Sequence, residues 1–145
     1  MLVACGGSDD QPVSADLPLG WESAKRVAEL IQLECSGSPY DNPNERVSFN
    51  AGNQKLDVDY REAHFRCAQD VEGFSREVGA AIDVLVQPID MNPQSVTKCD
   101  CLYDITILLE PVASGAHDVT VYRRWDNLND PNEPVRIGGG SVQVE

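Results

Sequence analysis

Apolar residues occur at every second position in several short stretches of the chain, and this alternation is typical of β-strands with one buried face. The clearest stretch runs from Cys101 to Glu110, where every odd-numbered residue is apolar and Pro111 follows as a stop. The alternating stretches together predict about seven to eight strands, at roughly 27–35, 46–50, 56–67, 82–86, 101–110, 119–125 and 142–144.

Polar segments rich in Asn, Pro and Gly separate these strands, and the longest are 36–45 and 127–134. Between Tyr60 and Phe65 the apolar positions change from even to odd numbers, which predicts a bulge or corner near 61–63. The triplet Gly138–Gly140 predicts a second bend or bulge. Many short strands with regular turns favour an all-β, antiparallel β-sandwich, and a small barrel is the alternative.

The N-terminal part has a different composition. Residues 6–20 are rich in Gly, Ser, Asp and Pro and predict a flexible tether, so that 1–20 precede a single domain at 21–145. Within 21–35 the pattern fits two structures. Ala24, Val27, Ala28 and Ile31 have the spacing of a short N-terminal helix, whereas the second half of the segment fits a strand.

Four cysteines remain when Cys5 is set aside: Cys35, Cys67, Cys99 and Cys101. An even number suits two disulfides formed in an oxidising compartment. A direct bridge between Cys99 and Cys101 would be strained, because their Cα atoms would lie roughly 6.6 Å apart on an extended strand. We therefore expect Cys35 and Cys67 each to bond to one of Cys99 and Cys101, with both pairings open.

All four sulfurs are expected in one interior layer, where the bridges would cross-link the two sheets. On a chain-entropy estimate, each bridge would add about 3–4 kcal/mol to the free energy of unfolding.

The net charge of the chain limits the classes of partner that it is expected to bind. The formal net charge is −13, which disfavours nucleic acid and attachment to anionic lipid through a basic patch, because both need clustered Lys and Arg. Solubility through self-repulsion explains the charge most simply, and a positively charged partner stays open.

The segment Leu2–Cys5 resembles the lipobox of bacterial lipoproteins, and Gly6–Asp10 resembles the tether that follows it. The resemblance implies lipidation of the Cys5 sulfur and a position in the bacterial cell envelope, with the N-terminal lipid as the only membrane attachment. Export would also require an apolar leader before Leu2, so we expect the gene to begin upstream of Met1.

The segment Cys99–Asp104, with Phe65–Cys67 before it and Asp118–Val121 after it, resembles a group of small, mostly uncharacterised bacterial lipoproteins. In that group a Cys-x-Cys-x-Tyr-Asp strand pairs with an earlier cysteine in an immunoglobulin-like sandwich. The resemblance covers roughly residues 56–125 and brings no catalytic residues. Cys35 is an addition of this chain.

Two metal sites are possible alternatives. His64, Cys67, Cys99 and Cys101 could supply one nitrogen and three thiolates to zinc, although their spacing is not that of paired knuckles. Asp126, Asn129 and Asp130 place oxygen ligands for calcium in one loop, and Asp41–Glu45 is a similar loop. Asn and Asp also form turns, which is the simpler interpretation of both loops.

Candidate catalytic groups are few. The chain has two histidines, His64 and His117, and lacks both the Gly-x-Ser-x-Gly elbow and a phosphate-binding loop. Asp57 and Asp59 alternate with apolar residues and suit a solvated strand face. We therefore predict a non-enzymatic binding or accessory module without a cofactor, which presents its Asn/Pro loops to an unknown protein or small ligand.

Overall fold

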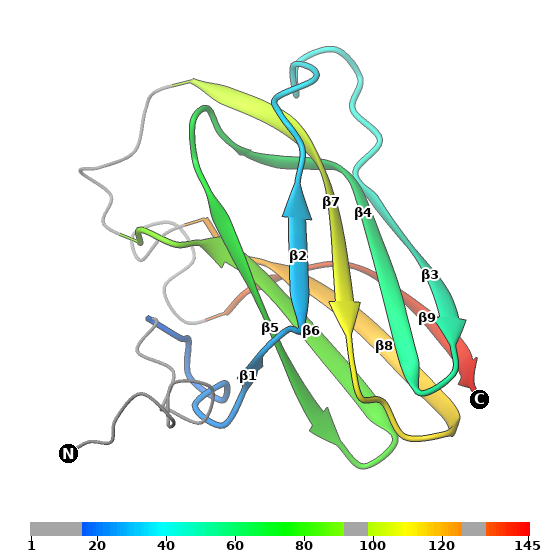
Figure 1. The fold of residues 1–145 in the computed structure, drawn as a ribbon. Helices are drawn as coiled ribbons and strands as arrows, with labels where there is room; N and C mark the ends of the chain where they lie inside the picture. Colours follow the sequence, from blue (N-terminus) through cyan, green and yellow to red (C-terminus); the bar gives the residue numbers. More distant parts are fainter. Residues whose placement is uncertain (1–15, 92–98, 126–132) are drawn as a thin grey trace, which may run out of the picture.

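The computed structural model describes residues 16–91, 99–125 and 133–145, which form two β-sheets packed face to face (Figure 1). The five-stranded sheet has the order β1-β5-β6-β8-β9, and the four-stranded sheet has the order β2-β7-β4-β3. The strands are β1 (Lys25–Arg26), β2 (Glu29–Gln32), β3 (Arg46–Gly52), β4 (Lys55–Arg66), β5 (Val71–Val78), β6 (Ala81–Pro88), β7 (Asp100–Leu109), β8 (Gly115–Arg123) and β9 (Val135–Val144). The predicted all-β, disulfide-bonded fold is confirmed, with nine strands in the described residues.

The main core lies between the sheets, and β4 shows how the sequence builds it. Leu56, Val58 and Tyr60 face inward before the register of β4 against β7 shifts, and Ala63 and Phe65 face inward after it. The shift lies between Tyr60 and Ala63, so the predicted bulge is confirmed. Each fully buried large side chain of this kind contributes about 1.5–3 kcal/mol to folding.

The short helix considered near the N-terminus does not form, because the described residues there are strands and turns. β1 pairs with β5 in one sheet, and β2 pairs with β7 in the other. The chain crosses between the sheets at Val27 and Ala28, whose N–H groups donate to the carbonyls of Gly73 and Leu108 at 3.1 and 3.0 Å. Val27 and Leu30 thus pack into the core instead of along a helix stripe.

Strand β5 was not predicted, because 68–79 resembles a polar loop. Its outer face is covered instead of solvated. Phe74 is fully buried in a second apolar cluster with Trp21, Ala24 and Leu85. Glu72 beside it is 8% exposed and accepts a hydrogen bond from Arg26 at 2.6 Å. Contacts with the N-terminal segment therefore accommodate an apolar and a charged residue on the same outward face.

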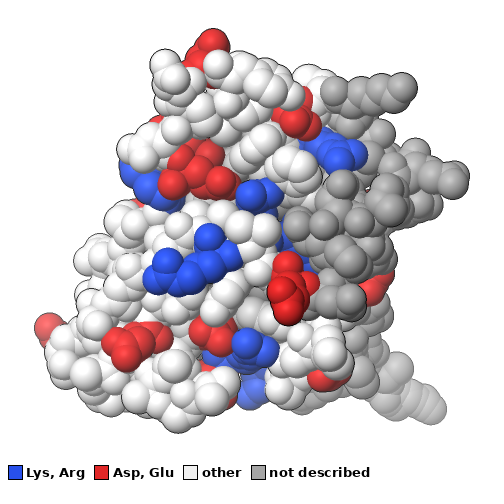
Figure 2. All heavy atoms as spheres, turned by 180° about the vertical axis from the view of Figure 1, so that it is seen from behind, with Lys and Arg blue, Asp and Glu red and all other residues white. Residues whose placement is uncertain are grey.

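That N-terminal segment runs over the outer face of the five-stranded sheet from Asp16 to Ala24. The Asp16 carbonyl accepts hydrogen bonds from Gln87 at 3.0 Å and from Arg124 at 2.6 Å. Gln87 and Arg124 are 0% and 1% exposed, and Arg124 also donates to Gln87 at 3.0 Å. Residues 16–20, which the sequence assigned to the tether, thus contact the domain. Figure 2 shows acidic and basic side chains interspersed on the face that it draws.

The pair β6–β8 is parallel, whereas the other strand pairs in the described sheets are antiparallel. Between these two strands the chain crosses to the four-stranded sheet, forms β7 there and returns. Because the chain leaves the five-stranded sheet after β6 and returns to it at β8, these two neighbouring strands can run in the same direction. The sequence pattern alone had indicated only antiparallel pairing.

Two disulfides form, Cys35–Cys101 and Cys67–Cys99, with Cα–Cα distances of 5.8 and 5.2 Å. The expectation that they cross-link the two sheets is wrong, because both lie at one end of the four-stranded sheet. The prediction that all four sulfurs lie in one interior layer is also wrong. Cys101 is buried, whereas Cys35 and Cys99 are exposed. Cys99 precedes the first residue of β7, so the strand alternation does not extend to it.

The glycine triplet of β9 lies where two strands approach closely. A Cβ atom on Gly138 would lie 2.9 Å from the Val47 side chain of β3, and one on Gly139 would lie 2.6 Å from the Val119 carbonyl oxygen. The register of β9 against β8 also shifts beside Gly138, in line with the predicted bulge.

Candidate functional site

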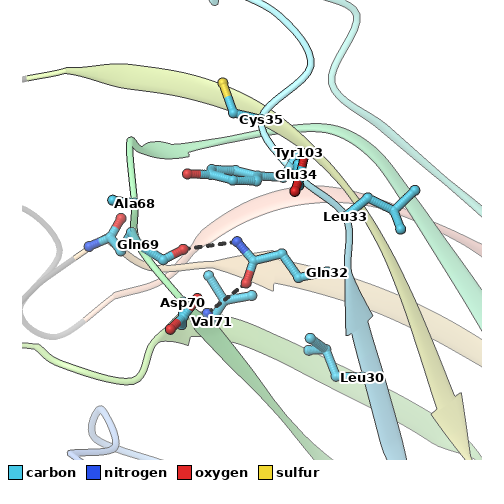
Figure 3. A pocket seen from close by; sticks show the side chains of 10 residues that line it. All are labelled: Leu30, Gln32, Leu33, Glu34, Cys35, Ala68, Gln69, Asp70, Val71 and Tyr103. Atoms are coloured by element: carbon cyan, nitrogen blue, oxygen red, sulfur yellow. Dashed lines mark hydrogen bonds between the residues drawn. The ribbon is translucent and has the colours of Figure 1, made fainter.

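An open groove of about 530 Å³ lies at the disulfide-bonded end, between β2 and the start of β5 (Figure 3). Its volume is in the range of ligand sites in proteins. One wall comes from β2 and the residues after it, and the other from the β4–β5 connection. The lining residues are Leu30, Gln32, Leu33, Glu34, Cys35, Ala68, Gln69, Asp70, Val71 and Tyr103.

The β2 wall is a sheet edge. Within the residues that the structure describes, β2 pairs with β7 on one side only, and the Leu33 N–H donates to the Asp104 carbonyl of β7 at 3.0 Å. Backbone groups alternate in direction along an antiparallel strand. The N–H and C=O groups of Leu30 and Gln32 therefore point away from β7, toward the side of the strand where the groove lies.

The Gln32 side chain connects the two walls. Its Nε2 donates to the Gln69 carbonyl at 2.8 Å, and its Oε1 accepts from the Val71 N–H at 3.0 Å (Figure 3). These two backbone groups flank Asp70, so the side-chain amide takes the place of the N–H and C=O of one residue in a parallel neighbouring strand. The Gln32 side chain thus supplies the hydrogen-bond partners for the edge of β5. The backbone N–H and C=O of Gln32 have no neighbouring strand among the described residues.

The walls are held by internal bonds. The Tyr103 hydroxyl donates to the Arg66 carbonyl at 2.8 Å, and Cys35 is bonded to Cys101. The rim is acidic, since Glu34 and Asp70 are both exposed and neither forms an ion pair within the described residues. The groove therefore offers apolar surface, unpaired strand edge and uncompensated negative charge.

A polar cluster lies on the edge of β4, where β3 stops pairing at Arg46–Arg61. One Glu45 oxygen accepts hydrogen bonds from the Tyr60 hydroxyl at 2.5 Å and from the His64 N–H at 3.0 Å. The Trp125 indole donates to the His64 carbonyl at 2.9 Å. Side chains thus form hydrogen bonds with the backbone groups of His64 that a neighbouring strand would otherwise bind.

Charge supports this cluster. The Arg123 Nε lies 3.4 Å from the same Glu45 oxygen, with its side chain 11% exposed. Burial raises the pKa of Tyr60 well above its ordinary value, and the Glu45 carboxylate raises it further. Tyr60 therefore stays protonated and keeps donating to Glu45 over the physiological range. The Glu45 carboxylate therefore has three partners within this cluster.

The predicted site residues have different outcomes. The four paired cysteines meet as two disulfides, and in this oxidised form Cys67, Cys99 and Cys101 have no thiolate to offer zinc. His64 Nε2 lies 3.2 Å from the Asp100 carboxylate. Cys5, Asp126, Asn129 and Asp130 lie outside the described residues.

The groove itself was not predicted. Gln32 had no assigned role, and Tyr103 was assigned only to the core. One signal was present in the sequence: Gln32 is a polar residue among Leu30, Ile31 and Leu33. A polar residue at an inward position needs hydrogen-bond partners, and here the edge of the opposite sheet provides them.

None of the described residues belongs to a helix long and apolar enough to cross a membrane. Comparison with protein-family models, curated proteins and solved structures finds no match. The functional argument therefore depends on the chain's own residues and geometry.

Proposed function

We propose that this protein is an exported, lipid-anchored, non-enzymatic binding module of the bacterial cell envelope, and that the groove beside β2 is its ligand site. The observation that carries the proposal is the pair of disulfides at the groove end of the sandwich. Stable disulfides are formed and kept in oxidising compartments. Lipidation of Cys5 follows from the lipobox resemblance of Leu2–Cys5.

The groove chemistry favours binding over catalysis. Among the described residues that line it are amide, phenol, carboxylate and apolar side chains, and its Cys35 sulfur is bonded to Cys101. Nucleophilic catalysis needs a nucleophile beside a positioned base. Apolar walls with a few fixed polar groups are instead typical of ligand sites.

Lipid attachment can be tested by placing an apolar export leader directly before Leu2, so that the Leu2–Cys5 segment is kept, and supplying labelled palmitate to the cells. We expect the label on the chain and partition into detergent, with both lost in Cys5→Ser. Cys35→Ser is the matched control, because it removes a different sulfur and should keep the label. An unlabelled chain carrying the leader and Cys5 would contradict anchoring.

The redox state can be tested by mass spectrometry without reductant. Two disulfides predict a mass about 4 Da below that of the fully reduced chain. Four free thiols with one bound zinc would instead support the alternative, a zinc protein that uses Cys67, Cys99, Cys101 and His64.

A further inference from the structure

We propose that the groove binds an extended peptide, which adds a strand to the free edge of β2 and carries apolar and basic side chains. This inference rests on the proposed binding function and names the class of partner. Binding by strand addition combines backbone hydrogen bonds for affinity with side-chain pockets for selectivity.

The backbone of β2 supplies the first part of the site. Leu30 and Gln32 direct their N–H and C=O groups away from β7, and the groove runs along this side. A strand placed there could exchange hydrogen bonds with both residues. Edge strands are commonly protected by length, charge or proline. β2 is short but carries exposed Ile31 on its outer face, at 49% exposure.

The groove walls supply the second part. Leu30, Val71 and Tyr103 give apolar surface, and Leu33 is 55% exposed at the side. An added strand turns every second side chain to the same face. Its inward-facing residues would then contact the apolar wall, which favours Val, Ile or Leu at those positions.

Charge supplies the third part. Glu34 and Asp70 stand on the rim of the groove without an ion pair within the described residues, and the chain has a net charge of −13. Basic residues of a peptide would face these carboxylates. Rim charges act chiefly on association rate and selectivity, so binding should weaken as salt rises.

Other parts of the fold fit such a partner less well. A second cavity of about 490 Å³ between β1 and the 110–112 segment is lined by both signs of charge, namely Lys25, Arg26, Arg76, Glu77 and Glu110, so its charge favours neither sign. β1 has two residues, and β9 packs its glycines against β3. Of the described edge strands β1, β2 and β9, β2 is the one that combines an open edge, apolar walls and one sign of charge.

The test uses the full, unlipidated chain and a fluorescein-labelled hexapeptide of alternating lysine and valine, with anisotropy as the readout. We expect saturable binding, with amide NMR shifts at Leu30, Gln32 and Val71. The matched probe carries an N-methyl group on every residue, which removes the N–H groups on both edges and should abolish binding. Equal binding of both probes would overturn strand addition.

Charge reversal provides the second test. The double variant Glu34→Lys/Asp70→Lys should weaken binding of the lysine–valine probe by about tenfold or more. The control, Glu77→Lys/Glu110→Lys, makes the same change in net charge at the other cavity and should bind as the original chain does. Equal weakening by both variants would overturn the assignment to this groove. Because no lipid is involved, failure here leaves the palmitate result at Cys5 standing, and the reverse also holds.

Discussion

Among the described residues of the four-stranded sheet, the outer edge of β2 and the edge of β4 beyond Arg61 both lack a neighbouring strand, and the chain treats them differently. Beyond Arg61 the edge of β4 is covered by the Glu45 carboxylate and the Trp125 indole, which bind the N–H and the C=O of His64. The edge of β2 keeps its backbone open, while its Gln32 side chain is used on β5. One edge is closed by side chains and the other is left accessible, which is why we place binding at the second.

The largest effect on stability is expected from removing the Cys35–Cys101 disulfide beside the open edge of β2. Cys35→Ser/Cys101→Ser deletes a disulfide with a sequence separation of 66 and should lower the free energy of unfolding by about 4 kcal/mol. The control pair Cys67→Ser/Cys99→Ser deletes a bridge with a separation of 32 and should cost slightly less. Urea denaturation measures both, and no loss in the first variant would contradict the bracing role.

Opening the closed edge should have the next largest effect. Glu45→Ala leaves the His64 N–H and the Tyr60 hydroxyl without their acceptor and Arg123 without its carboxylate. We expect a loss of about 2–3 kcal/mol in urea denaturation. Glu34→Ala on the open edge is the control and should stay within about 0.5 kcal/mol. If the two variants lose the same stability, the closed edge has no special role.

The closed edge should also respond to alkaline pH. The folded pKa of Tyr60 is raised, so above about pH 10 the unfolded chain releases a proton that the folded chain retains. The Tyr60 contribution is complete below that pH and falls by about 1.4 kcal/mol per pH unit above it, until the folded pKa is reached. Tyr60→Phe should have a flatter stability profile between pH 10 and 11, and identical slopes would sink this explanation.

The smallest effect is expected at the open edge. Gln32→Ala removes two hydrogen bonds to the Gln69 carbonyl and the Val71 N–H and should cost about 1 kcal/mol. The variant should also speed hydrogen exchange at the Val71 amide, because its acceptor is gone. Gln32→Glu keeps an acceptor for Val71 and should protect that amide better than Ala does. Equal exchange in both variants would mean that the amide bridge is unimportant.

Much of this fold could be predicted from the sequence, because the alternation of apolar and polar residues along a strand reflects the burial of one strand face. The bulge between Tyr60 and Ala63 and the pairing of Cys35 and Cys67 with Cys99 and Cys101 followed from local patterns. Strand β5 could not be predicted in this way, because the distant Trp21 and Arg26 cover its outer face.

The groove could not be predicted for a similar reason. It depends on where β2 ends relative to the opposite sheet, and on the Gln32 amide reaching Gln69 and Val71. Those residues are far apart in the sequence, so no window of residues around Gln32 contains its partners. The prediction that the Cys99 side chain points into the core was wrong, because β7 begins one residue later, at Asp100.

The crossover between β6 and β8 has a consequence for how the chain acquires its fold. β7 is the partner that joins β2 to β4, and the five-stranded sheet needs β8 between β6 and β9. A nascent chain shorter than about residue 109 therefore lacks the strand that joins the pieces of either sheet, and its early hairpins stay marginal. Most native contacts join distant segments, which slows folding. For the export that we propose, slow and late assembly would keep the polypeptide unfolded long enough to be threaded through a translocation pore.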